Sequence, residues 1–214
     1  MEHKVNLEEI SDGKLYRLND MIRLGCDGCN GAASCCRFAE DTITLDPYDI
    51  YELSLATGLT FEQLFAKQWI ALSPSDGLLL PHLNFALKDG VCPFLDGDGL
   101  CQIHAHRPGL CRLFPLARLF QDDTLYYIHQ IHECPNTVAP KTKIKKWLGV
   151  TAPEAYEHFL IRWNRILTNT KTAIQKAADN AALTATTTTF LKTYYFTPYD
   201  TTQEFYPQFE ARDR

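Results

Sequence analysis

The stretch that decides the fold of this chain runs from Cys92 to Pro115 and reads Cys-Pro-Phe-Leu-Asp-Gly-Asp-Gly-Leu-Cys-Gln-Ile-His-Ala-His-Arg-Pro-Gly-Leu-Cys-Arg-Leu-Phe-Pro. Its three cysteines, Cys92, Cys101 and Cys111, stand at nearly even intervals in a segment rich in proline and glycine, which interrupt helices and strands. Irregular backbone of this kind lets several thiolates converge on one ion. We interpret the stretch as half of a metal-binding or cluster-binding framework.

The composition is that of an ordinary globular protein. Of the 214 residues, 45 % are hydrophobic and 22 % are charged, so neither a disordered nor a fibrous chain is indicated. The net charge of -5 argues against nucleic-acid binding, which usually requires a basic excess. The chain has no run of 18 apolar residues and starts with a polar, acidic segment. We therefore expect neither a membrane span nor an export signal, and we expect a cytoplasmic location.

Eight cysteines in a reducing compartment point to metal ligation, because disulfides are rare there. A framework of structural disulfides, as found in short secreted domains, is the weaker alternative. All eight cysteines fall in predicted loops or at the ends of predicted elements, and all eight are candidate metal ligands: Cys26, Cys29, Cys35, Cys36, Cys92, Cys101, Cys111 and Cys134.

The spacing of the first cysteines leaves the metal open. A C-x2-C pair such as Cys26 and Cys29 occurs in both zinc and iron-sulfur sites. The neighbouring side chains of Cys35 and Cys36 tend to diverge, which leaves one of them as a spare, a redox thiol or a ligand to a second centre. Eight thiols permit two tetrathiolate centres, or one centre with a redox-active remainder. We expect one of Cys35 and Cys36 to share a pocket with the first pair and the later cysteines.

Two arginines in the central stretch, Arg107 and Arg112, are candidate cofactor-binding residues. A tetrathiolate cluster is anionic, and nearby cations would stabilise it and tune its potential. The alternative is that both form surface salt bridges. Because zinc needs only four ligands, eight thiols with two arginines favour an iron-sulfur cluster, with 4Fe-4S preferred and zinc as the alternative. Four histidines are possible further ligands, although each is more often a surface or core residue: His104, His106, His129 and His132.

The rest of the chain predicts a mainly α fold with a small antiparallel β element, in which helices flank an irregular, cysteine-rich, metal-nucleated core. The segments 25–41 and 92–115 have few apolar residues, so we expect metal binding to order them. Residues 1–140 form the predicted metal-binding domain and 141–214 a C-terminal helical extension packed on it. The predicted helices are 14–24, 46–57, 60–70 and 152–168. The predicted strands are 42–45, 78–87 and 124–131, and the last two form the predicted sheet. A turn is predicted at Asp122-Asp123, just before the last strand.

The cysteine pattern closely resembles a known family. Cys26-x2-Cys29-x5-Cys35-Cys36, followed by Cys-Pro-Phe-Leu-x5-Cys-x-Ile-x3-Arg-Pro-x2-Cys-Arg-x-Phe-Pro, is similar to the YkgJ-like cysteine-cluster family of zinc- or iron-chelating and iron-sulfur proteins. The resemblance covers about residues 20–136 and implies that the family's cluster cysteines are the first seven of this chain, with Cys134 in the place of a frequent downstream one. Two features depart from it: five residues rather than two precede the Cys-Cys pair, and His104 replaces a common aromatic residue.

The residues and the resemblance together leave three functions open. The first is a metal-binding protein that holds an iron-sulfur cluster, or zinc, and acts in redox chemistry or metal handling. The second is a group-transfer enzyme, because the family includes flagellin lysine N-methylases, although no glycine-rich strand-to-helix loop for a nucleotide-like methyl donor is visible. The third is a structural zinc module for protein-protein interaction. We expect a redox or protein partner and leave enzymatic activity undecided.

Overall fold

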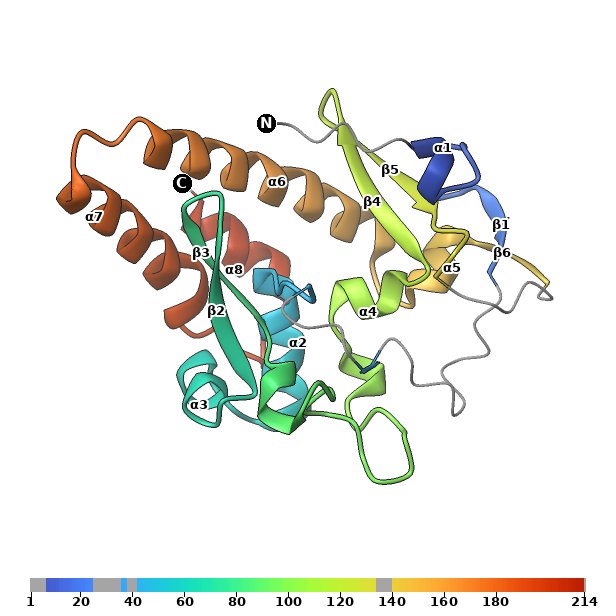
Figure 1. The fold of residues 1–214 in the computed structure, drawn as a ribbon, viewed down its shortest axis with the longest axis horizontal. Coiled ribbons are helices and arrows are strands. Elements are labelled where there is room, and N and C mark those ends of the chain that lie inside the picture. Colours follow the sequence, from blue (N-terminus) through green and yellow to red (C-terminus); the bar gives the residue numbers. More distant parts are fainter. Residues whose placement is uncertain (1–6, 25–35, 38–41, 134–139, 214) are drawn as a thin grey trace. The chain divides into compact units, whose positions relative to one another are not determined.

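The computed structural model describes residues 7–24, 36–37, 42–133 and 140–213. Helices make up 46 % of the structure, and the strands of the described residues form small antiparallel two-stranded sheets (Figure 1). This confirms a mainly α fold with minor antiparallel β structure. The predicted cysteine-rich metal core is not shown, because four of its eight cysteines lie outside the described residues: Cys26, Cys29, Cys35 and Cys134.

The first half of the chain contains α1 (Leu7–Ile10), β1 (Met21–Arg23), α2 (Pro47–Thr57), α3 (Phe61–Ala66), β2 (Ile70–Ser75), β3 (Leu78–Leu83), the 3-10 turns η2 (Phe85–Lys88) and η3 (His104–His106), and α4 (Gly109–Leu113). The second half contains β4 (Leu116–Gln121), β5 (Thr124–His129), β6 (Lys141–Lys143), α5 (Ile144–Leu148), α6 (Pro153–Gln175), α7 (Asn180–Leu191), the π-helix η4 (Lys192–Phe196) and α8 (Phe205–Arg212).

The chain folds as two compact units. Unit 1 takes its described residues from Met1–Asn30 and Arg112–Arg162, and unit 2 takes its own from Gly31–Cys111 and Trp163–Arg214. The two units are defined by how the chain packs. The predicted division at residue 140 is a different one, because it separates a metal-binding region from a C-terminal extension. That division stays a prediction.

In unit 1 the β4–β5 hairpin is the central element. Its turn is the predicted Asp122-Asp123, and both residues adopt positive φ, at 46° and 57°. Tyr127 of β5 is fully buried and pairs with Tyr16 through backbone hydrogen bonds of 2.9 Å. This pairing holds the N-terminal segment against the hairpin.

The predicted helix 14–24 is wrong. Met21–Arg23 is a strand that pairs with β6, and burial alternates along it, with Ile22 buried between two exposed residues. Leu15 and Leu18 have helical spacing, but the Asp20 carboxylate accepts a hydrogen bond from the Arg17 amide in a tight turn. Long-range strand pairing therefore overrides the local pattern.

In unit 2 helix α2 confirms the predicted helix 46–57. Asp46 is the N-cap: its side chain accepts from the Asp49 amide at 2.9 Å, and the Asp49 carboxylate accepts from the Asp46 amide at 3.0 Å. Pro47 occupies the first turn, and Gly58 ends the helix with φ of 70°, a conformation that glycine adopts without strain. Each of these signals is local, which is why the sequence predicts this helix well.

Helix α3 begins at its predicted capping box but ends earlier than the predicted range 60–70. Thr60 and Gln63 exchange the two capping hydrogen bonds. Gln68 then adopts φ of 58°, and the chain enters β2 at Ile70. Ile70 therefore begins a strand rather than completing a last helical turn.

The pairing of the predicted strands is wrong. Residues 78–83 pair with β2 instead of with 124–129, which pair with β4, so both strands belong to hairpins. The β2–β3 turn is Asp76-Gly77, a strong hairpin signal because both residues tolerate positive φ. The predicted strand 42–45 is reduced to one bridge between Thr44 and His82.

The C-terminal part of unit 2 is an aromatic core. Helix α6 runs to Gln175, beyond the predicted end at 168, and Trp163 on it packs against four rings: Phe190, Tyr194, Tyr195 and Phe209. The tail contains α7, η4 and α8. Among the described residues, no helix combines the length and apolar character needed to cross a membrane.

Candidate metal centre

Four of the eight candidate ligands can be placed: Cys36, Cys92, Cys101 and Cys111. Cys92 is buried, with 6 % of its surface exposed, and the other three are half-buried. No disulfide joins any two of these four described cysteines. All four lie in unit 2. The remaining candidates, Cys26, Cys29, Cys35 and Cys134, lie outside the described residues.

Cys36 and Cys92, which are far apart in the sequence, lie next to each other in the structure. The Cys92 amide donates a hydrogen bond of 2.9 Å to the Cys36 carbonyl. The neighbouring residues Arg37 and Val91 form an antiparallel bridge. Two segments that are far apart in sequence are thereby held side by side, so Cys36 lies next to the segment that carries Cys92.

Cys92 and Cys101 are joined by a compact turn. Leu95 and Cys101 form an antiparallel bridge, and the Asp96 carboxylate accepts hydrogen bonds from the amides of Asp98 and Leu100 at 3.0 and 2.8 Å. Such Asx contacts let an aspartate replace regular structure in a turn. The turn folds the chain back, so that Cys101 pairs with a residue only three positions after Cys92.

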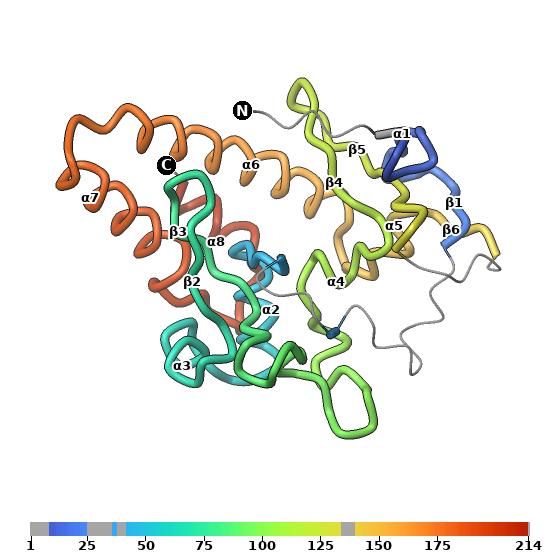
Figure 2. The backbone as a smooth tube through the Cα atoms, in the orientation of Figure 1, coloured from blue at the N-terminus to red at the C-terminus, as the bar shows by residue number. Residues whose placement is uncertain are grey.

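The Lys88 side chain supports this turn. Its Nζ donates to the carbonyl of Pro93 at 2.8 Å and to that of Leu95 at 3.5 Å. Figure 2 traces the segment in green from the end of η2 at Lys88 to the start of α4 at Gly109. The backbone beside Cys92 is therefore held by a lysine that immediately precedes the segment.

The second turn, between Cys101 and Cys111, is anchored to helix α2. The Asp49 carboxylate accepts a hydrogen bond of 2.7 Å from the Gly109 amide, and Glu52 Oε2 lies 3.0 Å from His106 Nδ1. Both acids are buried, with 2 % and 8 % of their surfaces exposed. We call Asp49 and Glu52, with their partners Gly109 and His106, the α2 anchor.

The carboxylates of α2 also act on their surroundings. Burial first, and then the negative charges of Asp46 and Asp49, raises the pKa of Tyr195 well above its ordinary value. The Tyr195 hydroxyl donates to the Leu45 carbonyl at 2.9 Å. It therefore stays a neutral donor beside the acidic start of α2.

The expectation that segment 92–115 has too few apolar residues to order itself is wrong for its first part. Phe94, Leu95 and Ile103 are buried, with 3 %, 5 % and 7 % of their surfaces exposed. With the α2 anchor, these contacts fix the segment through the protein itself. The same expectation for segment 25–41 falls almost wholly outside the described residues.

The two candidate arginines are engaged with the protein. Arg107 Nη1 donates to the His104 carbonyl at 2.7 Å and lies 3.3 Å from His104 Nδ1, which fixes its cation on the turn between Cys101 and Cys111. Arg112 is buried, with 4 % of its surface exposed, and donates to the Gly149 carbonyl at 3.3 Å. Their roles toward a cluster stay predictions.

The histidines give little support for imidazole ligation. His106 contacts Glu52, and His104 faces the Arg107 guanidinium, which can only donate hydrogen bonds. Within the described ranges, no three Cys, His, Asp or Glu side chains form a group that could hold a metal ion. The described thiols therefore do not form a complete ligand set, and the assignment of the cysteines as metal ligands stays a prediction.

Sequence analysis missed the α2 anchor. Asp49 and Glu52 sit in an ordinary capped helix, and their partners are far away along the chain, so no local pattern marks them. Lys88 was missed for a related reason, because a single lysine at the end of a short turn is usually a solvated charge.

The comparisons with known proteins agree with the cysteine pattern. A family model described as "CxxCxxCC: Putative zinc- or iron-chelating domain" matches residues 25–137, which include all eight cysteines. Neither the curated proteins nor the solved structures contain a match to the chain. The family match spans more than half of the chain, and it confirms the resemblance to a cysteine-cluster family. The chain therefore belongs to the CxxCxxCC family of zinc- or iron-chelating domains.

Proposed function

We propose that this chain is a metal-binding protein that holds an iron-sulfur cluster through its cysteines, with 4Fe-4S preferred over zinc. The observation that carries the proposal is the arrangement of Cys36, Cys92, Cys101 and Cys111. Backbone hydrogen bonds or bridges hold Cys36, Cys92 and Cys101. Cys111 lies in the short helix α4, which starts at the anchored Gly109, and no disulfide joins any two of the four. Thiolates held in fixed positions are soft ligands suited to zinc or iron.

The cysteine thiols are chemically suited to bind such a cluster. Cys36 and Cys92 are linked by a backbone hydrogen bond, and Cys101 pairs with Leu95 close to Cys92. Because no described trio of ligands exists, we propose that the set is completed from Cys26, Cys29, Cys35 and Cys134. The number of candidate thiols exceeds what one zinc ion uses, which favours the larger cluster.

A bound cluster would supply one-electron chemistry, and the protein would supply its surroundings. The α2 anchor would keep the turn that carries Cys101 and Cys111 in place, and Arg107 and Arg112 would offset negative charge. We propose a redox or metal-handling role in the reducing cytoplasm, with a redox or protein partner. No contact among the described residues favours group transfer, so a methylase activity is not part of this proposal.

Serine substitution tests the ligand assignment. Cys101→Ser and Cys111→Ser each replace a soft thiolate by a poorly ionised hydroxyl. We expect anaerobically purified variants to lose visible absorbance and most of their iron. Leu100→Ser is the matched control, because Leu100 lies in the same segment, is 49 % exposed and supplies no thiol. Unchanged iron in both cysteine variants would contradict their assignment as ligands.

A further inference from the structure

A basic surface lies in unit 1, on the small sheet that β1 and β6 form (Figure 1). The register pairs Arg23 with Lys141 and Met21 with Lys143. In an antiparallel pair, opposite residues point to the same face, and so do residues two positions apart on one strand. All four side chains therefore share one face of the sheet, and all four are exposed. We call Arg23, Lys141 and Lys143, with Met21 among them, the basic face.

The other face fixes the sheet to unit 1. Ile22 is buried, and Ile144, directly after β6, is fully buried. The amides of Ile144 and Lys145 donate to the carbonyls of Asp20 and Leu18 at 3.1 and 2.9 Å, which continues the contact beyond the strands. The basic face is therefore the outward side of an ordered element rather than a loose run of charged residues.

The cations of the basic face lie close together. Directly opposite residues have Cβ atoms roughly 4.5–5.5 Å apart, and diagonal neighbours such as Arg23 and Lys143 are about 7–8 Å apart. Among the described residues, none of the three cations has a hydrogen-bond or ion-pair partner. The carboxylate of Asp20, the acid next to β1, accepts instead from the Arg17 amide at 2.7 Å. The face therefore presents three positive charges to solvent.

Local stability does not account for these charges. Like charges directly opposite each other, as on Arg23 and Lys141, destabilise a strand pair. Lys143 is the N-cap of α5 and makes no capping bond, whereas Ser, Thr, Asn or Asp would accept one from the helix amides. The next lysine, Lys145, differs because it pairs with Glu154 at 3.3 Å. An anion from outside would relieve the repulsion that the fold leaves in place.

We propose that the basic face docks an acidic, extended segment of a partner protein. Carboxylates two positions apart on such a segment are about 6.6 Å apart, twice the rise per residue, and Lys141 and Lys143 have the same spacing on β6. The chain's net charge of -5 does not prevent docking, because charges more than about 10 Å away are largely screened at 0.1 M salt.

The composition of the face favours a protein over other anionic partners. Nucleic acid would call for more than three cations, and a membrane would call for more apolar surface than Met21 provides. The face contains no cysteine. The inference therefore goes beyond the metal-binding proposal, and its failure would leave that proposal untouched.

Fluorescence anisotropy with a labelled hexaglutamate peptide at low salt tests the assignment, with hexaglutamine as the uncharged probe. Lys141→Gln and Lys143→Gln should each weaken the binding of hexaglutamate roughly twofold to fivefold, the range for an exposed charge pair. A triple variant that adds Arg23→Gln should weaken it about tenfold or more. Hexaglutamine should not bind, and raising the salt concentration should reduce the differences between the proteins.

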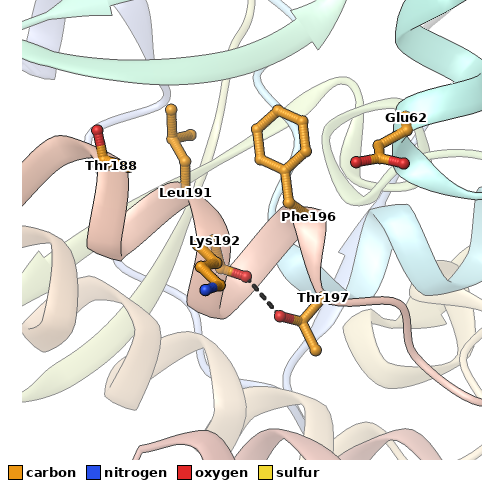
Figure 3. A pocket seen from close by; sticks show the side chains of 6 residues that line it. All are labelled: Glu62, Thr188, Leu191, Lys192, Phe196 and Thr197. Carbon is orange, nitrogen blue, oxygen red and sulfur yellow. Dashed lines mark hydrogen bonds between the residues drawn. The ribbon is translucent and has the colours of Figure 1, made fainter.

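Lys192→Gln is the matched control. Lys192 is an exposed lysine of unit 2 that lines a pocket with Glu62 and Phe196 (Figure 3), outside the basic face. Its replacement changes the net charge by the same amount as Lys141→Gln. This control should bind hexaglutamate like the wild type.

The proposal is overturned if the wild type does not bind hexaglutamate, if the triple variant binds it equally well, or if Lys192→Gln weakens binding as much as the variants of the face. Stronger binding of hexathymidylate or of phosphatidylserine vesicles, lost in the same variants, would replace the protein partner by a nucleic acid or a membrane. Circular dichroism of each variant confirms that a lost affinity is not a lost fold.

Lysines on an edge strand can also serve to keep copies of a chain apart. Size-exclusion chromatography of the triple variant separates this role from docking. A triple variant that self-associates but binds hexaglutamate like the wild type would overturn the proposal, whereas a monomeric variant with weakened binding supports it.

Discussion

Two regions of unit 2 reach order by different means. The C-terminal region, from Phe190 to Phe209, packs aromatic rings around Trp163, which is 6 % exposed. The cysteine segment, from Cys92 to Cys111, buries Phe94, Leu95 and Ile103 and is also held by hydrogen bonds to helix α2. In the first region, burial of aromatic rings supplies most of the driving force for order.

In the cysteine segment, Asp49, Glu52 and Lys88 hold the backbone through contacts that involve no thiol. In an aromatic core the same thiols would be buried among rings as small hydrophobes. The comparison predicts that stability and metal binding can be changed separately.

The largest expected effect is in the aromatic region. Trp163→Ala removes a ring that contacts Phe190, Tyr194, Tyr195 and Phe209, and should lower the free energy of unfolding by about 3–5 kcal/mol. Chemical denaturation measures this loss. Metal content per folded molecule should stay at the wild-type level. A loss of metal in proportion to the loss of stability would show that the two regions are not independent.

The next effect concerns the α2 anchor. Asp49→Ala leaves the buried amides of Gly109 and Asp46 without their acceptor, at a cost of about 1–3 kcal/mol for each. Hydrogen exchange at Gly109 should accelerate in this variant and metal affinity should fall. In the wild type, the same amide should stay protected after metal removal, because the anchor contains no metal ligand.

Asp98→Ala is the control for Asp49→Ala. Asp98 is exposed and lies in the same cysteine segment, and its own carboxylate has no role in the turn that Asp96 forms. This control should match the wild type in exchange at Gly109. Equal exchange in the Asp49→Ala variant and the wild type would show that the anchor does not hold the segment.

A smaller effect is expected for the second contact of the anchor. Glu52→Gln and His106→Asn should each cost roughly 1 kcal/mol, and the double variant should cost less than their sum, because the two residues share one hydrogen bond. Denaturant titration of the wild type, the two single variants and the double variant gives the coupling free energy between the two residues. Strict additivity would mean that the contact of 3.0 Å contributes nothing to stability.

The smallest effect comes from a buried carboxylate that has no anchor role. Glu157 Oε1, in unit 1, is buried without a hydrogen-bond partner among the described residues, and burial raises the pKa of Glu157 above its ordinary value of 4.5. Its contribution to stability is thus present below pH 4.5 and lost as pH rises through the folded pKa. Glu157→Gln should raise the melting temperature modestly at neutral pH and leave it unchanged at pH values below 4.5.

Glu154→Gln, in the same helix, should change stability at neutral pH in the opposite direction. Hydrogen bonds that its carboxylate accepts, first from its own backbone amide and then from Lys145, lower the pKa of Glu154. Its contribution is present above the ordinary value of 4.5 and is lost as pH falls through the folded pKa. This variant should melt slightly lower at neutral pH. Identical melting profiles for both glutamine variants would contradict the assigned pKa directions.

Local signals account for what the sequence predicts correctly. The cap at Asp46, Pro47 in the first turn and Gly58 at the end define α2 within one window of sequence, and Asp122-Asp123 marks its hairpin in the same way. The cysteine spacing identifies the family. Each of these features is decided by residues that are close together along the chain.

Long-range pairing accounts for what the sequence does not predict. Residues 14–24 show helical spacing, but Met21–Arg23 within them form a strand with β6, more than 100 positions away. The hydrogen bond from the Gly109 amide to Asp49 spans 60 positions. Such contacts depend on the whole fold and leave no periodic pattern in either partner. The carboxylates of the anchor therefore become visible only in three dimensions.

Metal analysis of the wild-type protein tests the central claim most directly. Protein purified without oxygen should be brown, absorb in the visible range, and contain iron and acid-labile sulfide in equal amounts, as a 4Fe-4S cluster requires. A colourless protein with stoichiometric zinc would contradict the iron-sulfur assignment and leave a structural zinc module. Protein that holds neither metal, although its eight thiols are shown to be reduced, would contradict metal binding itself.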